Sequence, residues 1–368
     1  VVVLMLAGLL LAFALPLITA TRAVVLSIIV IAAVAGLNLW MYLGFGLVLP
    51  LAGALTMCVT AFALNMSYGY FVESRSKREL AHLFGTYVPP ELVDEMVKDP
   101  DSYSMVATNR QMTVMFCDMR GFTKMSEQME PLQLQALLNE VFSRLTSLIR
   151  ANRGTIDKYM GDCVMAFWGA PVASPDHAEL AVKSALRMVE VIRAVNEIHV
   201  AQGLPEIGIG IGINTGFMCV GDMGSQERQA YTVIGDSVNL GSRLEGLSKT
   251  YGVEIVVSGS TRKAVQGIAW QELDRVRVKG KEEAVSIYTP IGPADALTPD
   301  QVTLLRNWAL FLKAYRAQDW EQCDVLLLNM HRLGSGKTLY HLYQERLNQN
   351  RRAALGSDWD GATTFETK

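Results

Sequence analysis

The sequence predicts an α+β protein, a mixed sheet covered by helices, that follows three transmembrane helices. Three apolar runs cover residues 3–20, 23–43 and 46–72, and Arg22 is the only charged residue in this part of the chain. Between residues 110 and 290, short runs rich in β-formers alternate with long segments whose apolar residues recur at helical spacing. Strands and helices in this order favour one sheet with helices packed on it.

The apolar part, residues 1–72, is expected to cross the membrane three times. Each run is long enough to span a hydrocarbon core of about 30 Å. Tyr68 and Tyr70 suit the membrane interface, and three basic residues follow within 75–78, so the positive-inside rule places the rest of the chain in the cytoplasm. The sequence starts with Val1. We therefore expect the C-terminal part of a longer, multi-pass protein of the inner cell membrane, in contact with lipid, whose missing part lies outside.

Charge and cysteine usage argue against two classes of function. The net charge is −3 and there is no basic block, which argues against binding to nucleic acid. The five cysteines show no CxxC spacing, and no histidine pairs with Cys or Glu at ligand spacing. We therefore expect no zinc site, and cysteines that stay reduced in the cytoplasm.

Residues 73–104 are predicted to form a helical linker that transmits a signal. Residues 73–84 continue the third span as a charged helix, and Pro89 and Pro90 interrupt it. Pro90 is well placed in the first turn of the next helix. A helix that leaves a membrane span is a route for passing a rotation or shift to the next domain. A plain solvated stalk fits the sequence equally well.

Residues 105–292 are predicted to be one α+β domain. Gly161 should join its second and third strands as a hairpin. Residues 293–352 are predicted to be a helical extension, and the polar residues 353–368 a disordered tail. The expected strands are 110–118, 154–160, 163–169, 207–216, 253–258, 268–278 and 285–290, and the expected long helices are 131–151, 176–203 and 235–250.

Two glycine-rich segments fail as nucleotide-binding loops. In GSGKT (334–338), the first glycine of a phosphate-binding loop would fall at His331, and a helix precedes the segment instead of a strand. In GIGIG (208–212), the third glycine and the following helix of a dinucleotide loop are absent. We interpret these glycines as small residues in a tightly packed strand.

Two aspartates predict metal-dependent phosphoryl chemistry. Asp118 in VMFCDMRGFT and Asp162 in KYMGDCVMAF each lie beside a run rich in β-formers and bounded by glycine. One such aspartate is more often a solvated strand end, but a pair is suited to hold divalent cations over nucleotide phosphates. After the first aspartate, a turn into a short helix would present the N–H groups of Gly121, Phe122 and Thr123 to phosphate oxygens. Phe122 is expected mainly to fill the core.

Further segments carry side chains suited to a nucleotide. Lys158 lies on the strand that leads to the second aspartate, and Thr232 precedes the helix begun after Gly235. Asn239 and Arg243 are four residues apart and therefore share one face of that helix. Arg offers a fork of donors to phosphate oxygens, and Asn can orient a ribose. The segment VKGKEE adds two lysines on a glycine turn, a plausible lid for terminal phosphates.

Together these segments resemble the catalytic domain of class III nucleotide cyclases over about residues 105–290. The resemblance rests on the ordered motifs FCDMRGFT, DKYMGDCVMAF, INTG, YTVIGDSVNLGSRLE and VKGKEE, and it implies a ferredoxin-like mixed sheet covered by helices. FGTYVPPELVDEMV resembles the segment before this domain in membrane-linked bacterial members. The three spans resemble the end of a CHASE2-type sensor. The whole therefore looks like a membrane-bound bacterial adenylate cyclase with an upstream extracellular sensor.

The resemblance also assigns a role to each candidate residue. It implies binding of two Mg²⁺ or Mn²⁺ ions by Asp118 and Asp162, purine recognition by Lys158 and Thr232, transition-state stabilisation by Asn239 and Arg243, and triphosphate binding by Lys279, with Lys281 as the alternative. Gly241 stands where relatives often have alanine and is expected to be harmless.

The base-recognition pair favours ATP as the substrate. A lysine can donate to adenine N1 and a threonine hydroxyl can accept from the adenine amino group, whereas guanine presents the opposite pattern. The family resemblance implies cyclisation of ATP to cyclic AMP and pyrophosphate at two sites shared between the subunits of a homodimer. Two alternatives stay open. A guanylate cyclase is disfavoured by Lys158 and Thr232, and a catalytically inactive nucleotide-binding or dimerisation domain should lack at least one motif residue, but none is missing.

Overall fold

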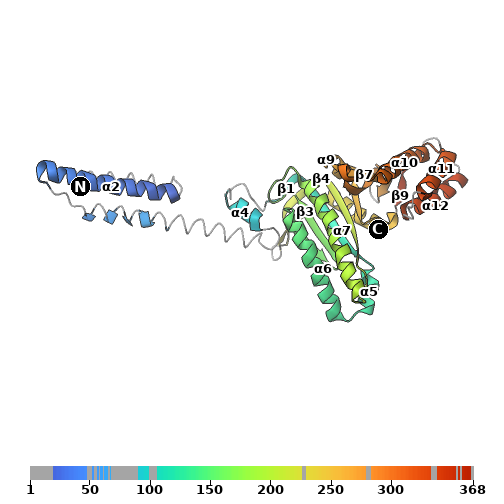
Figure 1. The fold of residues 1–368 in the computed structure, drawn as a ribbon, viewed down its shortest axis with the longest axis horizontal. Helices are drawn as coiled ribbons and strands as arrows, with labels where there is room; N and C mark the ends of the chain where they lie inside the picture. Colours follow the sequence, from blue (N-terminus) through green and yellow to red (C-terminus); the bar gives the residue numbers. More distant parts are fainter. Residues whose placement is uncertain are drawn as a thin grey trace. The chain divides into compact units, whose positions relative to one another are not determined.

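A computed structural model describes most of the chain and divides it into two compact units, residues 1–86 and 87–368 (Figure 1). The described residues are 20–47, single residues and short pieces between 52 and 67, 90–98, 106–225, 229–278, 283–332, 338–353, 355–356 and 359–365. Each unit is considered by itself.

The first unit contains one long apolar helix among its described residues. Helix α2 covers Ala20–Phe45, and its part Val25–Phe45, with a mean hydropathy of 2.1, is long and apolar enough to cross a membrane. It coincides with the predicted span 23–43. The predicted span 3–20 lies almost entirely outside the described residues, and only scattered helical residues of the span 46–72 are described.

In the second unit, the described residues form a nine-stranded mixed sheet with the strand order β2-β3-β1-β4-β6-β8-β7-β9, and β5 pairs with β4. Pairing is antiparallel except for β4 with β6 and β7 with β9, which confirms the predicted mixed sheet. The strands are β1 (Thr108–Arg120), β2 (Thr155–Met160), β3 (Cys163–Trp168), β4 (Gly208–Gly224), β5 (Gln229–Ile234), β6 (Ile255–Ser258), β7 (Ile268–Val278), β8 (Val285–Pro293) and β9 (Thr363–Phe365).

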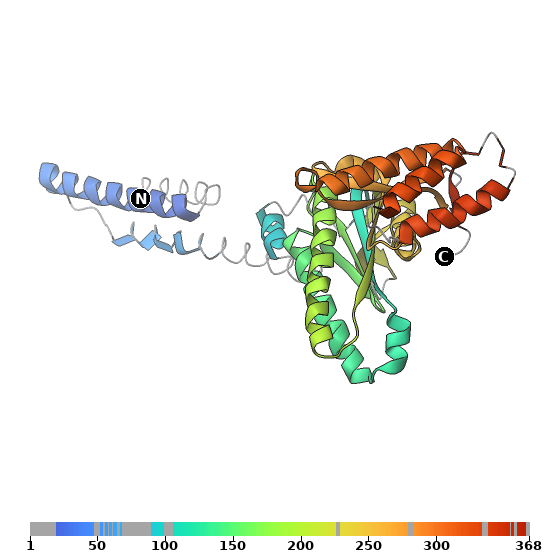
Figure 2. The ribbon, with the colours of Figure 1, turned by 45° about the vertical axis from the view of Figure 1, so that its right-hand side comes forward.

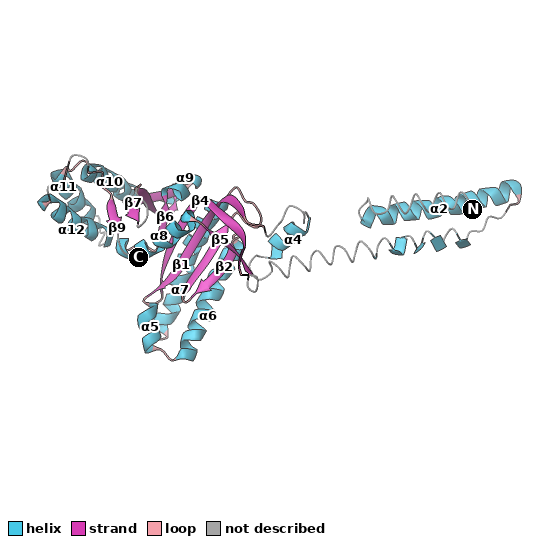
Figure 3. Cartoon of the chain, turned by 180° about the vertical axis from the view of Figure 1, so that it is seen from behind, coloured by secondary structure: helices cyan, strands magenta, loops and turns pink. Residues whose placement is uncertain are grey.

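Helices cover both faces of this sheet. Figure 1 shows α6 and α7 side by side on one face, and Figure 3 shows the strands from the other side. Alternate residues of β1 and β4, such as Met115, Cys117 and Ile211, face α6 and α7 in a continuous apolar core. The helices are α4 (Pro90–Lys98), α5 (Phe122–Gln128), α6 (Pro131–Ala151), α7 (His177–Ala201), α8 (Asp236–Tyr251), α9 (Gly259–Ala264), α10 (Pro299–Arg316), α11 (Trp320–Arg332) and α12 (Thr338–Arg352), with the short 3₁₀ helix η3 (Ala294–Ala296).

Helix α8 lies unusually close to β4 on the opposite face. A Cβ atom on Gly212 would lie 2.2 Å from the backbone nitrogen of Glu245, and one on Gly210 would lie 2.4 Å from Oγ of Ser248. These positions therefore need glycine, which confirms the interpretation of GIGIG as small residues in a packed strand. Gly241 belongs to the same contact, because its Cβ would lie 2.9 Å from Cγ1 of Val114. An alanine there would require a shift of β1 or α8.

The linker helix α4 is packed and not solvated. Its side chains Leu92, Val93 and Met96 are buried, and Glu95 accepts a hydrogen bond of 2.8 Å from Arg153, in the turn between α6 and β2. The stalk alternative is therefore wrong for residues 90–98, which belong to the second unit.

Helices α10, α11 and α12 form the predicted C-terminal extension and gather beside β7 (Figure 2). They share a second apolar core with α8 and β7, in which the Trp308 ring lies 5.1 Å from those of Phe311 and Tyr343. The predicted disorder of the tail is wrong for residues 359–365. Trp359 packs on Tyr315, with ring centroids 5.3 Å apart, and β9 pairs with β7.

A buried ion pair joins the extension to β7. Arg346 on α12 donates a hydrogen bond of 2.7 Å to Oδ2 of Asp274 on β7, whose side chain is 2% exposed. The same oxygen accepts hydrogen bonds from Tyr251, the last residue of α8 (2.6 Å), and from Thr363 on β9 (2.8 Å). One carboxylate therefore holds four separate elements together.

We predict that Arg346→Met lowers the free energy of unfolding of the second unit by about 3–5 kcal/mol, because it leaves the buried Asp274 charge without its cation. The matched control is Arg351→Met. Arg351 bonds Asp324 at 2.6 Å, but both side chains are more than two-fifths exposed, so the loss should stay below about 1 kcal/mol. Chemical denaturation measures both. Equal losses would contradict the role given to the buried pair.

Candidate active site

Strand pairing brings the two predicted metal-binding aspartates together. Strand β1 continues to Arg120, so Asp118 lies inside it and not at its end as predicted. Asp162 lies in the turn between β2 and β3, and the register Cys117↔Val164 aligns this turn with the end of β1. The side chains of Asp118 and Asp162 lie within hydrogen-bonding reach of each other.

The environment of this pair is electrostatically unfavourable without a cation. Burial, followed by repulsion from Asp162, raises the pKa of Asp118 to about 6. Carboxylate oxygens are the ligands that Mg²⁺ and Mn²⁺ prefer, and Mg²⁺ commonly takes one or two carboxylates plus substrate phosphates. The pair fits such ions. Among the described residues, no group of three or more His, Cys, Asp or Glu side chains could hold a metal ion, and substrate phosphates and water are the other usual ligands of such an ion.

A third acid, Glu245, lies beside the pair and was not predicted. Its Oε1 would be only 2.7 Å from a Cβ on Gly210, and Gly210 is the β4 partner of Asp118. Burial, followed by repulsion from Asp118, raises the pKa of Glu245 to about 7, although Arg120 opposes this. The sequence pattern does not indicate that Glu245 lies near Asp118, because this contact depends on the close approach of α8 to β4.

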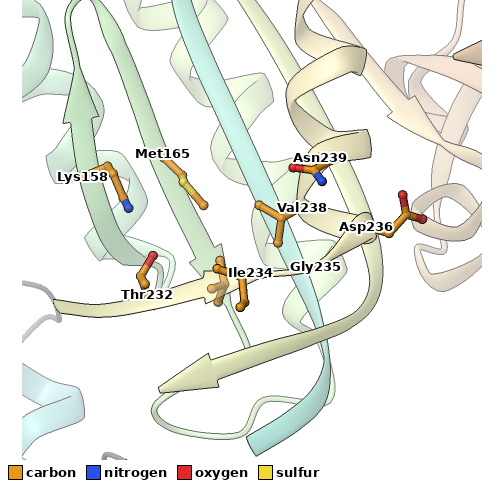
Figure 4. Close-up of a pocket in the computed structure, with 9 residues that line it drawn as sticks. Lys158, Met165, Thr232, Ile234, Gly235, Asp236, Val238 and Asn239 are labelled. Carbon is orange, nitrogen blue, oxygen red and sulfur yellow. The ribbon is translucent and has the colours of Figure 1, made fainter. Parts of the chain in front are cut away.

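The predicted base-recognition residues line one pocket of about 480 Å³. Lys158 comes from β2, Thr232 from β5 and Asn239 from the first turn of α8. Figure 4 shows the nitrogen of Lys158 and the oxygen of Thr232 pointing toward each other, while Met165 and Val238 supply apolar walls. This size and mixture of polar and apolar groups suits a small organic ligand.

The remaining candidates lie outside this pocket. Arg243 is half-buried one turn after Asn239 on α8. Gly121, with φ of 73°, turns β1 into α5, and Phe122 packs against the core as predicted. Thr123 is exposed on α5. Lys279 and Lys281 lie outside the described residues.

One chain thus holds two separate groups of candidate residues. The first is the carboxylate pair Asp118 and Asp162, and the second is the pocket formed by Lys158, Thr232 and Asn239. Neither aspartate lines the described pocket. Within one chain these candidate residues therefore do not surround one closed cavity.

Comparison with known proteins identifies the family. Residues 105–289 match the model of the adenylate and guanylate cyclase catalytic domain, and this chain belongs to that family. Adenylate cyclase 1 of Rhizobium meliloti is 37% identical over 221 residues, which is 60% of this chain and 33% of that protein. An adenylate cyclase of Anabaena cylindrica is 38% identical over 190 residues, which is 50% of this chain and 37% of that protein. The matches thus span only about a third of the length of these relatives.

Solved structures of related proteins were also found. The adenylyl cyclase CyaB from P. aeruginosa is 34% identical, with a TM-score of 0.48, and the match covers 52% of this chain and 99% of that one. The guanylyl cyclase Cya2 is also 34% identical, with a TM-score of 0.47 and coverage of 52% and 97%.

We predict that Asp118→Asn stabilises the metal-free protein by a few degrees at pH 7.5, and that this difference shrinks toward pH 4. The folded-state pKa of Asp118, about 6, lies above its ordinary value of 3.8. The wild type therefore loses stability as the pH rises through 6, whereas asparagine does not titrate. Thermal unfolding in EDTA measures the difference.

Two controls accompany this measurement. Asp295→Asn replaces an exposed residue and should change the unfolding temperature at neither pH. With saturating Mn²⁺, the wild type should unfold at a higher temperature than Asp118→Asn, because the ion stabilises only the protein that binds it. A difference between wild type and Asp118→Asn that is the same at both pH values would contradict the prediction.

Proposed function

We propose that this chain is the catalytic part of a membrane-bound adenylate cyclase that converts ATP to 3′,5′-cyclic AMP and pyrophosphate. The observation that carries the proposal is the placement of Lys158 and Thr232 in one pocket. An ammonium donor and a hydroxyl acceptor are complementary to N1 and the amino group of adenine. The family membership and the adenylate cyclase relatives support the same choice.

The reaction is an intramolecular phosphoryl transfer in which the ribose 3′-oxygen attacks the α-phosphorus and pyrophosphate leaves. Asn239 would orient the ribose, and Arg243 would stabilise negative charge on the transferring phosphoryl group. Lys279, or Lys281 in its place, would bind the terminal phosphates, and the backbone N–H groups of residues 121–123 would contact phosphate oxygens.

Asp118 and Asp162 would hold two divalent cations, Mg²⁺ or Mn²⁺. When bound, such ions acidify a coordinated hydroxyl and neutralise phosphate charge. The repulsion between the two carboxylates supports this assignment, because a cation relieves it. None of the described pocket residues is placed as an obvious general base.

We also propose a homodimer with active sites shared between subunits. The proposal is supported by the separation of the two groups of residues within one chain. Large apolar side chains are exposed on three strands of the sheet, namely Tyr159 and Met160 on β2, Phe217 on β4 and Ile234 on β5. Exposed apolar side chains of this size are suited to be buried against a second copy.

The location in the inner membrane, three transmembrane helices and control by an upstream extracellular sensor belong to the same proposal. Helix α2 supports at least one membrane span. The packing of α4 in the second unit supports a mechanical connection between the linker and the catalytic domain. A guanylate cyclase is the less favoured alternative, since guanine would place its N1 donor against Lys158.

We expect residues 73–368 with Mn²⁺ to form cyclic AMP from ATP and much less cyclic GMP from GTP. Chromatography of the products measures both. Asn239→Ala should reduce the rate by at least about 100-fold, because it removes a group expected to act in the transition state. A dimeric preparation that forms no cyclic AMP would reject the proposal, and a preference for GTP would favour the alternative.

A mixture of Asp118→Ala and Asn239→Ala subunits should recover activity that neither variant has alone. Each mixed dimer would hold one site with both groups intact, so about a quarter of the wild-type activity is expected if subunits mix randomly. Differently tagged subunits allow the mixed dimer to be isolated before assay. An inactive mixed dimer would show that the site is not shared between subunits.

A further inference from the structure

A buried carboxylate, Asp157, lies behind the base-recognition pocket. Its side chain is 1% exposed, and its Oδ1 lies 3.2 Å from Nζ of Lys158. Its Oδ2 accepts a hydrogen bond of 2.5 Å from the Thr232 hydroxyl and a longer one of 3.4 Å from the backbone N–H of Val233. Asp157 therefore contacts both base-recognition side chains.

An irregularity in β2 produces this arrangement. The register between β2 and β3 shifts between Ile156 and Lys158, so Asp157 has no partner in the pairing. In a regular strand, neighbouring side chains point to opposite faces. A bulge redirects side chains, and here Asp157 and Lys158 both reach the Thr232 side, while Tyr159 packs on Phe142 of α6 with ring centroids 4.7 Å apart.

We propose that Asp157 is a positioning residue that makes the pocket selective for a 6-aminopurine. An ionised carboxylate can only accept hydrogen bonds, and a hydroxyl has one proton. Because Thr232 donates this proton to Asp157, only lone pairs of its oxygen face the ligand. They accept from an amino group and repel a carbonyl oxygen. The other oxygen, Oδ1, forms an ion pair with the Lys158 ammonium, which is the donor for a bare ring nitrogen. The inference rests on the proposed function.

A purely structural role is the alternative. Asp157 could simply join β2 to β5 through its bond to Val233, and its loss would then weaken every ligand equally. The two roles differ in one measurable quantity, the preference for a purine with a 6-amino group over the same purine without one. A site that pairs with a substrate group rejects the analogue that lacks it.

The test compares ATP with purine riboside triphosphate, which lacks only the amino group, as substrates of the full chain in detergent. We expect the wild type to prefer ATP by about 10- to 100-fold in kcat/KM, the range that corresponds to one unpaired polar group. Asp157→Leu removes the acceptor at similar volume and should reduce the preference to less than about threefold. Asp157→Asn keeps an amide oxygen and should give an intermediate value. An unchanged preference in whichever of these variants folds would overturn the proposal.

Two controls isolate the effect. Thr232→Val should abolish the preference, and adding Asp157→Leu to it should change the preference no further, because Asp157 acts through the hydroxyl. Asp274→Asn alters a carboxylate that is equally buried but lies outside the pocket, so it should leave the preference unchanged. A further loss in the double variant would contradict the proposed route.

A binding measurement separates this inference from the proposed reaction. The 3′-deoxy forms of both triphosphates lack the attacking hydroxyl, so their dissociation constants with Mn²⁺ can be compared without turnover. If the wild type forms no cyclic product but prefers 3′-deoxy-ATP, the reaction is wrong and the inference stands. If the wild type binds both analogues equally, the inference is overturned even when cyclic AMP is formed.

Discussion

The close contact between α8 and β4 is the constraint on which the rest of the site depends. Without side chains at Gly210 and Gly212, the helix backbone approaches the sheet directly. That approach places Glu245 near Asp118, and it sets where Asn239 stands at the pocket. The far end of α8 is fixed by the Tyr251–Asp274 bond. Because α8 is held both along its length and at its end, its side chains have little freedom to move, as the precise positioning of a functional group requires.

Charge is concentrated in this part of the molecule at a cost to folding. Burial, followed by repulsion among Asp118, Asp162 and Glu245, raises the pKa values of Asp118 and Glu245. Asp157 contrasts with them, since a cation and two donors surround it. The carboxylates of Asp118 and Asp162 therefore lie beside other acids, whereas the carboxylate of Asp157 lies beside a cation and two donors.

The sequence predicted most of the strands and helices, and it predicted the candidates Lys158, Thr232 and Asn239, which the structure places in one pocket. Runs of β-forming residues predicted the strands, and glycines at turns predicted where the strands end, as at Gly161 between β2 and β3. The misses concern relations between distant segments. The contact of Asp157 with Thr232 depends on a bulge in β2 that no residue pattern reveals, and the position of Glu245 depends on the approach of α8 to β4. The tail was predicted to be disordered because it is polar, although Trp359 and Phe365 pack against the second apolar core.

The pairing of β9 with β7 also bears on solubility. An unpaired strand edge can recruit the edge of another molecule and start aggregation. Three residues near the C-terminal end, Thr363–Phe365, cover the outer edge of β7 at Val276–Val278. The residues of β9 therefore protect this edge of β7 from pairing with another molecule. Shortening the chain before Thr363, or fusing a bulky tag directly after Phe365, would expose that edge, although Asn239 lies more than a hundred residues earlier in the sequence.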